Sequence, residues 1–255
     1  MIHIQDLSCR FGDKEILHNI SLDIEEGGFY AILGANGCGK TTFLRCVSGL
    51  LEPSMGNVSL GKEKRPLKTF SARELAQKIS FVRQQASTDF EFSAFEIVLM
   101  GRNPYQKRMQ NESQADKEIV ERCMRQTNTF HLRHSKPHEM SGGELQRVMI
   151  ARALAQSTPI MLLDEPTSNL DIAHQFEIME LLRDIREKEG KTILIVVHDL
   201  NLALQYCPQT ILLHKGDIFQ KGKTADVLTP ENISTIFGVD AIRENNHLRF
   251  CHKDR

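Results

Sequence analysis

Apolar and polar residues alternate in two segments near the start of the chain, at residues 2–7 and 16–24. Alternation places the apolar side chains on one face of an extended segment, which is typical of half-buried antiparallel strands. Residues 11–14 lie between the two segments and have the composition of a turn. The pattern therefore predicts that the chain begins with antiparallel β structure.

Further along the chain, short runs with the length and composition of strands alternate with helical patterns. The predicted strands lie at residues 29–33, 56–60, 79–83, 159–164, 192–197 and 210–214. Helices are predicted where periodic apolar residues have serine, proline or glycine at their ends. These helices span residues 42–48, 71–77, 94–100, 113–127, 141–155, 173–188, 201–206, 224–228 and 230–237.

Strand signals are absent between residues 86 and 155, where helical patterns dominate. We therefore predict a single domain with an α/β core and an inserted helical subdomain. The core would consist of residues 1–85 and 159–222, and the helical subdomain of residues 86–158. Residues 223–255 would form a short C-terminal extension that carries the pattern of one final strand.

The composition is ordinary for a soluble globular protein, with 255 residues, 40% of them hydrophobic and 25% charged. A formal net charge of −1 argues against a protein that binds nucleic acid mainly through electrostatics. No apolar run approaches the roughly 18 residues that would span a bilayer, and no signal peptide is visible. No C-x-x-C pair occurs among the six cysteines, which favours reduced thiols and a cytosolic location: Cys9, Cys38, Cys46, Cys123, Cys207 and Cys251.

One segment matches the phosphate-binding pattern G-x-x-x-x-G-K-[ST], and it lies between a predicted strand and a predicted helix. Such a loop turns successive backbone N–H groups toward a phosphate and places a helix N-terminus against it. We predict that it binds a nucleotide through nine consecutive residues: Gly34, Ala35, Asn36, Gly37, Cys38, Gly39, Lys40, Thr41 and Thr42.

Individual residues of this loop have different expected tasks. Gly37 and Gly39 allow close backbone approach or φ values that a Cβ would disfavour. Lys40 supplies a positive charge to the β- and γ-phosphates. The hydroxyl of Thr41 is a ligand for Mg²⁺.

Two acids follow the apolar strand at residues 159–164, and a histidine follows the strand at residues 192–197. Strand ends face the crevice where ligands bind in α/β sheets. Asp164 is therefore placed to hold Mg²⁺, and Glu165 to orient and deprotonate a water. The alternative is that these acids cap the next helix. His198 can hydrogen-bond a γ-phosphate or the attacking water.

A second anion-binding helix start is predicted at residues 141–144, where Ser141 precedes Gly142 and Gly143 without bulky side chains. With this segment the chain resembles the ATP-binding cassette (ABC) ATPases, from Phe11 to about residue 222. The resemblance implies an α/β phosphate-loop NTPase fold with an N-terminal antiparallel β subdomain and an inserted helical signature subdomain.

The resemblance also implies roles for individual residues. Phe11 would stack on adenine, and Gln84 would touch Mg²⁺ and sense a membrane partner. The signature, Ser141 to Glu144, would reach the γ-phosphate bound by a second copy of the chain. Asp171 would belong to the D-loop, and His198 would be the switch histidine.

Three positions depart from the usual family pattern. Glu144 replaces the commoner Gln, which a helix N-terminus tolerates. Arg83 stands where Pro often precedes the glutamine, so either Gln84 or Gln85 fits that role. Cys38 stands where Ser is frequent.

Residues 98–105 resemble a segment of the ATPases that serve iron–siderophore, haem and cobalamin importers. This branch implies ATP and Mg²⁺ as cofactors, a homodimer, two integral-membrane permease subunits and a substrate-binding protein. It implies a peripheral location at the cytoplasmic face of the inner membrane, and no nucleic-acid partner. An exporter ATPase and a soluble ABC ATPase acting on nucleic acid or ribosomes are the alternatives, and the transported compound stays open.

Overall fold

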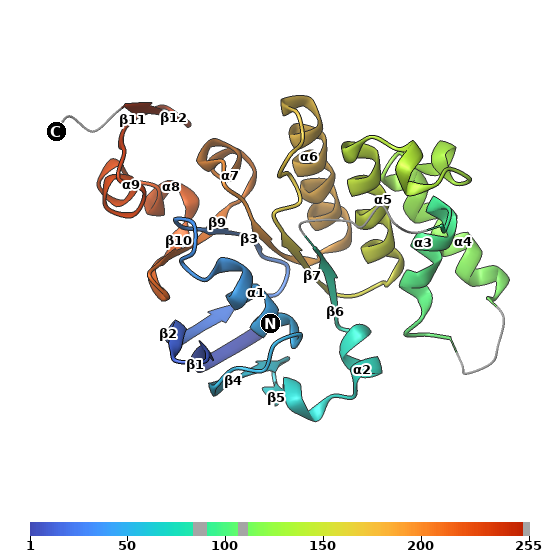
Figure 1. Cartoon of the computed structure of the whole chain (residues 1–255), viewed down its shortest axis with the longest axis horizontal. Helices are drawn as coiled ribbons and strands as arrows, with labels where there is room; N and C mark the ends of the chain where they lie inside the picture. The colour runs from blue at the N-terminus through green and yellow to red at the C-terminus, as the bar shows by residue number, and fades with distance from the viewer. Residues whose placement is uncertain (84–90, 107–111, 252–255) are drawn as a thin grey trace. The chain divides into compact units, whose positions relative to one another are not determined.

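The computed structural model describes residues 1–83, 91–106 and 112–251. It contains two compact units (Figure 1), one formed by Met1–Thr69 with Leu182–Arg255 and the other by Phe70–Leu181. The division falls within helix α6 (Ile172–Glu189). The predicted limits of the helical subdomain, residues 86–158, stay a prediction.

The first unit begins with the antiparallel sheet that the alternating pattern predicts. Its strand order is β2-β1-β4-β5, with β1 (Ile2–Phe11), β2 (Lys14–Ile24), β4 (Met55–Leu60) and β5 (Arg65–Pro66). Ile2 pairs with Ile24 on one side and with Leu60 on the other. The apolar side chains of these residues are buried, which explains the alternation in the sequence.

Parallel strands form the buried part of the same unit. Strand β3 (Phe29–Leu33) pairs in parallel with both β8 (Thr192–Val196) and β9 (Gln209–His214). Every residue of β3 and β8 is buried. Each buried Val, Leu, Ile or Phe side chain stabilises the fold by roughly 1.5–3 kcal/mol. These short apolar runs therefore fix where the loop after β3 begins.

Strand β10 (Asp217–Lys223) pairs antiparallel with β9 and was not predicted. It contains mostly polar residues, and none of them is fully buried. Its pairing depends on the turn at Lys215 and Gly216, whose φ angles are 48° and 90°. An exposed polar edge strand has too weak a hydrophobic pattern to be found from the sequence.

The rest of the first unit is helical apart from a C-terminal hairpin. Helices and 3₁₀ turns are α1 (Lys40–Ser48), η1 (Leu67–Thr69), α7 (Leu200–Tyr206), α8 (Thr224–Val227) and α9 (Pro230–Phe237). Helix α1 ends at Gly49, which has φ 74° as the predicted cap requires. The tail forms two strands, β11 (Asp240–Glu244) and β12 (His247–Cys251), where one was expected.

The second unit pairs two parallel strands with a group of helices. The strands are β6 (Ile79–Val82) and β7 (Ile160–Asp164). The helices are α2 (Ala72–Ala76), α3 (Ala94–Leu99), α4 (Gln114–Gln126) and α5 (Gly142–Ala155), with 3₁₀ turns η2 (Met100–Arg102), η3 (Phe130–Leu132) and η4 (Pro137–Glu139). Helices α3, α4 and α5 pack against one another (Figure 1).

Four helices of this unit begin with capping boxes. In each, a serine hydroxyl accepts a hydrogen bond from the backbone N–H three residues on, and the acid at that position bonds back. The serine–acid pairs are Ser71–Glu74, Ser93–Glu96, Ser113–Asp116 and Ser141–Glu144. Each such cap stabilises its helix by about 1 kcal/mol.

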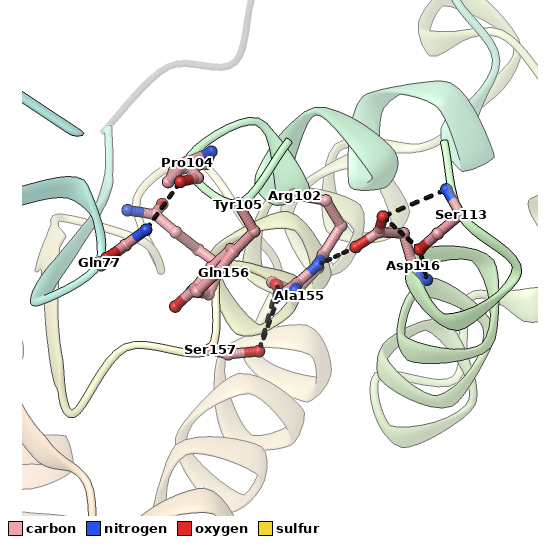
Figure 2. A network of polar contacts seen from close by, with 9 residues as sticks. All are labelled: Gln77, Arg102, Pro104, Tyr105, Ser113, Asp116, Ala155, Gln156 and Ser157. Atoms are coloured by element: carbon pink, nitrogen blue, oxygen red, sulfur yellow. Dashed lines mark hydrogen bonds and ion pairs between the residues drawn. The ribbon is translucent and has the colours of Figure 1, made fainter. Parts of the chain in front are cut away.

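A buried ion pair fixes the segment after α3 (Figure 2). The guanidinium of Arg102 donates from Nε to Oδ1 of Asp116 at 2.9 Å, and from Nη1 to the carbonyl of Ala155 at 2.7 Å. Only 8% of the Arg102 side chain and 13% of the Asp116 side chain are exposed. The Arg102 guanidinium also lies 4.1 Å from the centre of the Tyr105 ring. The pair therefore joins α4, the end of α5 and the segment after η2.

Close packing surrounds this ion pair. A Cβ on Gly101 would lie 3.2 Å from Cβ of Ala155 and would clash with the carbonyl oxygen of Arg152. The Tyr105 hydroxyl donates to the carbonyl of Gln156, and Gln77 donates to the carbonyl of Pro104 (Figure 2). Residues 101–105 are thus held on several sides.

Replacing Arg102 by Ala should destabilise the protein strongly, because Asp116 would keep a buried charge without its partner. Breaking a buried pair costs about 3–5 kcal/mol, which urea denaturation of the wild type and the variant at pH 7 would measure. The hydrogen bond from Arg102 lowers the pKa of the Asp116 carboxyl. This contribution is full above the carboxyl's unfolded pKa, and it is lost as the pH falls through the lower folded pKa.

Lys188→Ala is the matched control, because Lys188 pairs with Asp184 on the exposed surface of α6, where 70% and 46% of the side chains are accessible. It should leave the unfolding midpoint nearly unchanged. Equal midpoints for the Arg102 and Lys188 variants would contradict the role of the Arg102–Asp116 pair.

Candidate functional site

The loop between β3 and α1 has the backbone conformation that its glycines permit. Gly34, Gly37 and Gly39 have φ angles of 150°, 75° and 105°. A Cβ on Gly34 would lie 2.6 Å from the Sγ atom of Cys38, and one on Gly39 would lie 2.7 Å from a methyl of Leu17. Gly37 has open space around it, so only its φ angle requires glycine.

The loop also holds Lys40 in a fixed position. Its Nζ atom donates to the carbonyl of Gly34 at 2.9 Å and to that of Ala35 at 3.1 Å, and the residue is 5% exposed. Lys40 is the first residue of α1, which has no acidic residue in its first turn and no side-chain cap at Gly39. A positive charge and uncapped backbone N–H groups therefore meet at one helix start, an arrangement that attracts phosphate.

The other predicted residues of this loop differ in exposure. Asn36 is exposed, and Thr41 and Thr42 are partly exposed in the first turn of α1. Cys38 is buried, its thiol lies against Gly34, and burial raises the pKa of this thiol. The thiol therefore faces the inside of the loop.

Two further predicted residues belong to the first unit. Phe11 ends β1 with 53% of its surface exposed, as a side chain that stacks on a ligand requires. His198 is exposed shortly after β8. Its neighbour Asp199 caps α7 by accepting from the N–H groups of Asn201 and Leu202 at 2.7 and 3.1 Å.

In the second unit, the two predicted carboxylates follow one another at the end of β7. Asp164 is 3% exposed, and Glu165 has φ 51°, in the left-handed region. That conformation costs a non-glycine residue roughly 1–2 kcal/mol. The backbone N–H and the hydroxyl of Ser168 both donate to the Glu165 carbonyl, at 3.1 and 2.9 Å, and so hold this turn.

These acids do not cap the next helix. The cap of α6 is Asp171, whose Oδ1 accepts from the backbone N–H of His174 at 2.9 Å. The alternative role of Asp164 and Glu165 as caps of that helix is therefore not what the structure shows. A strained residue beside a buried carboxylate at a strand end is typical of a functional site.

The predicted signature residues form the start of α5. Ser141 donates to Oε2 of Glu144 from its backbone N–H and from its hydroxyl, both at 2.8 Å. These hydrogen bonds hold the pKa of the Glu144 carboxyl below its usual value. Ser141 and Gly142 are exposed, whereas Gly143 is buried.

One residue near the signature was missed from the sequence. The ring of His174 lies against Gly143, and its Nδ1 atom is 2.7 Å from Oδ1 of Asp171. The three-residue spacing of Asp171 and His174 at the start of α6 could have suggested the pair, but no sequence pattern places the ring against residue 143.

The predicted Mg²⁺ ligands lie in both units. Thr41 belongs to the first unit and Asp164 to the second, and Gln84, with its alternative Gln85, lies outside the described residues. A threonine hydroxyl and a buried carboxylate are the hard oxygen donors that Mg²⁺ prefers. The residues present therefore fit the metal chemically.

None of the helices in the described part of the chain has the length and apolar character to span a bilayer.

Known families, proteins and solved structures resemble this chain. The family model described as ABC transporter matches residues 17–168. The ferric enterobactin transport ATP-binding protein FepC of Escherichia coli (strain K12) is 38% identical, over 92% of this chain and 86% of that protein.

Two solved structures resemble this one. An inward-facing putative metal-chelate type ABC transporter aligns with a TM-score of 0.85 and 28% identity, over 99% of this chain and 98% of that chain. A dimeric ATP-binding cassette, MJ0796, bound to ADP and Pi, aligns with a TM-score of 0.75 and 31% identity, over 88% and 99%. With a family match over more than half its length, the chain belongs to the ABC transporter family as an ATP-hydrolysing cassette that serves membrane transport.

Proposed function

We propose that this chain is the ATP-hydrolysing subunit of a bacterial importer for an iron chelate, a siderophore complex or haem, with cobalamin as the alternative cargo. The observation that carries the proposal is the similarity to a ferric enterobactin transport protein over 92% of this chain. The resemblance to a metal-chelate type transporter supports the same branch. The subunit would act as a homodimer on two separate permease subunits at the cytoplasmic face of the inner membrane.

In this proposal the loop of the first unit binds the phosphates of ATP. The N–H groups at the start of α1 and the Nζ atom of Lys40 would donate to the β- and γ-phosphates, and Phe11 would stack on adenine. Lys40 already lies buried at the loop, 2.9 Å from the Gly34 carbonyl, so its charge needs little rearrangement. Asn36, Gly37, Cys38 and Thr42 would contribute loop backbone and polar groups.

Thr41, Asp164 and Gln84 would hold Mg²⁺, which neutralises phosphate charge when bound. Glu165 would accept the proton of the attacking water, and His198 would orient that water or the γ-phosphate. The strained turn at Glu165, held by Ser168, supports a fixed direction for this carboxylate. A second copy would supply Ser141, Gly142, Gly143, Glu144 and Asp171.

An exporter subunit is the competing function. The segment at residues 98–105 favours an importer of the chelate branch. Arg102 within it is buried and paired with Asp116, which gives the segment the rigidity that a permease contact needs. We propose that the permease binds near Gln84 and residues 93–108.

Uptake measurements in a strain that lacks this gene would test the proposed function. Labelled ferric siderophore, haem and cobalamin would be supplied to cells that carry the wild-type chain, Lys40→Ala or no chain. The wild type should restore uptake of an iron chelate, and Lys40→Ala should not. Restoration of cobalamin uptake alone would select the alternative cargo, and unchanged uptake of all three would overturn the proposal.

Glu165→Gln should bind ATP normally but hydrolyse it about 10²–10⁴ times more slowly, because the proton acceptor is lost. The variant should therefore accumulate as an ATP-bound dimer, detected by size-exclusion chromatography with ATP. Turnover close to that of the wild type would mean that another residue takes the proton.

Cys38 should react slowly with iodoacetamide, because its thiol is buried and its pKa is raised. Cys251, the exposed cysteine, is the internal comparison and should react first. Mass spectrometry of labelled peptides would follow both, and ATP should slow the Cys38 reaction further. Cys38 labelling as fast as that of Cys251 would contradict this orientation of the thiol.

A further inference from the structure

We propose that His174 is a positioning residue for ATP hydrolysis, because its imidazole ring sets the position of the α5 start through Gly143. The inference rests on the proposed function in one respect: the start of α5 must reach the γ-phosphate that a second copy holds. It does not depend on which compound is transported.

Asp171 fixes the His174 ring in one orientation. Its Oδ1 atom lies 2.7 Å from the ring Nδ1 and accepts from the backbone N–H of His174 at 2.9 Å. These two hydrogen bonds lower the pKa of the Asp171 carboxyl, which therefore stays ionised. A charged acceptor strengthens both bonds, so the ring is held by the same group that caps α6.

The opposite edge of the ring lies against the signature. A Cβ on Gly143 would be 2.6 Å from the ring atom Cδ2, 2.8 Å from Cγ and 3.2 Å from Nε2. Contacts under 3.0 Å force one of the two groups to move. Because Asp171 restrains the ring, a side chain at residue 143 would displace α5.

The two signature glycines therefore have different reasons to be glycine. A Cβ on Gly142 would make only an ordinary contact with Leu170, at 3.5 Å, and Gly142 is exposed. Gly143 is buried under His174. Glycine in a helix lowers the stability of the helix by about 1 kcal/mol relative to alanine. The local helix structure gives no reason for glycine at residue 143, whereas the contact with the His174 ring does.

Further contacts make the support of His174 rigid. The side chain of Gln175 donates to the carbonyls of Thr167 and Leu170, at 3.2 and 3.1 Å, and so braces the turn before α6. Arg147 of α5 donates to Glu177 of α6 at 2.7 Å. The first two turns of α5 and α6 are thus joined by two contacts, of which the His174–Gly143 contact lies nearer to the exposed Ser141.

A positioning role follows from the precision that phosphoryl transfer needs. Donors to a γ-phosphate act only in the correct place, and a displacement of about 1 Å can cost a hundredfold in rate. The His174 ring fixes the position of the helix start that carries Ser141 and Gly142, without touching the nucleotide itself.

The test uses steady-state ATP hydrolysis by the full-length chain, with ATP binding and thermal unfolding measured in parallel. Gly143→Ala should lower kcat about tenfold to a hundredfold by displacing α5, with little change in ATP affinity at Lys40. Adding His174→Ala should restore most of that loss, because the new methyl group occupies space that the ring has left. Gly142→Ala is the matched control, and His174→Ala should not rescue whatever loss it causes.

His174→Asn separates positioning from simple stability. Its amide can donate to Asp171 as Nδ1 does, so this variant should keep a higher kcat than His174→Ala at an equal unfolding temperature. An equal KM for ATP in both variants would place the effect after binding.

A Gly143→Ala, His174→Ala double variant as slow as Gly143→Ala alone would overturn the inference, because the loss would then arise at the phosphate and not at the ring. Failure of the chelate uptake experiment would leave this result unaffected, since hydrolysis is measured without cargo. A wild-type chain that hydrolyses no ATP would instead overturn the proposed function.

Discussion

The first backbone N–H groups of a helix have no hydrogen-bond partner inside the helix. In this protein some helix starts satisfy these groups with a side-chain cap, and the start of α1 does not. Helices α2, α3, α4 and α5 satisfy them with a serine and an acid three residues later. Helix α1 has neither a side-chain cap nor an acid in its first turn. Strand β3, buried at every residue, holds this start in place.

Helix α5 combines both features. Ser141 and Glu144 satisfy each other in a capping box, and yet the residues between them are glycines. The box would lose part of its hydrogen bonding when the Ser141 hydroxyl turns to a phosphate, a change of about 1 kcal/mol. Under the proposed function, this change would be small beside the electrostatic gain from a γ-phosphate, and the box would keep the helix intact between turnovers.

Features that depend on a few neighbouring residues could be predicted from the sequence. The phosphate loop, the capping boxes and the apolar strands belong to this class, because each depends on residues within a few positions of one another. Strand β10 and the hairpin of β11 and β12 were missed or incomplete, because they are polar edge strands that long-range pairing stabilises. The inward direction of the Cys38 thiol depends on φ angles that no composition reveals.

Contacts between residues that are distant in the sequence could not be predicted either. The Arg102–Asp116 pair and the His174–Gly143 contact join residues that are 14 and 31 positions apart, and both depend on how helices pack. Neither contact was predicted from the sequence. The roles of the predicted site residues stay predictions, and the groups that pack against them became visible only in the structure.

The C-terminal hairpin limits how far the chain can be shortened. The Asn201 side-chain amide donates to the Leu248 carbonyl at 3.1 Å and accepts from the Leu248 N–H at 2.7 Å. Two hydrogen bonds therefore join β12 to α7. Helix α7 begins directly after His198 and Asp199. A chain that ends before His247 would expose apolar surface on α7 and remove both bonds. A variant trimmed at this end for crystallisation would therefore loosen the segment that carries His198.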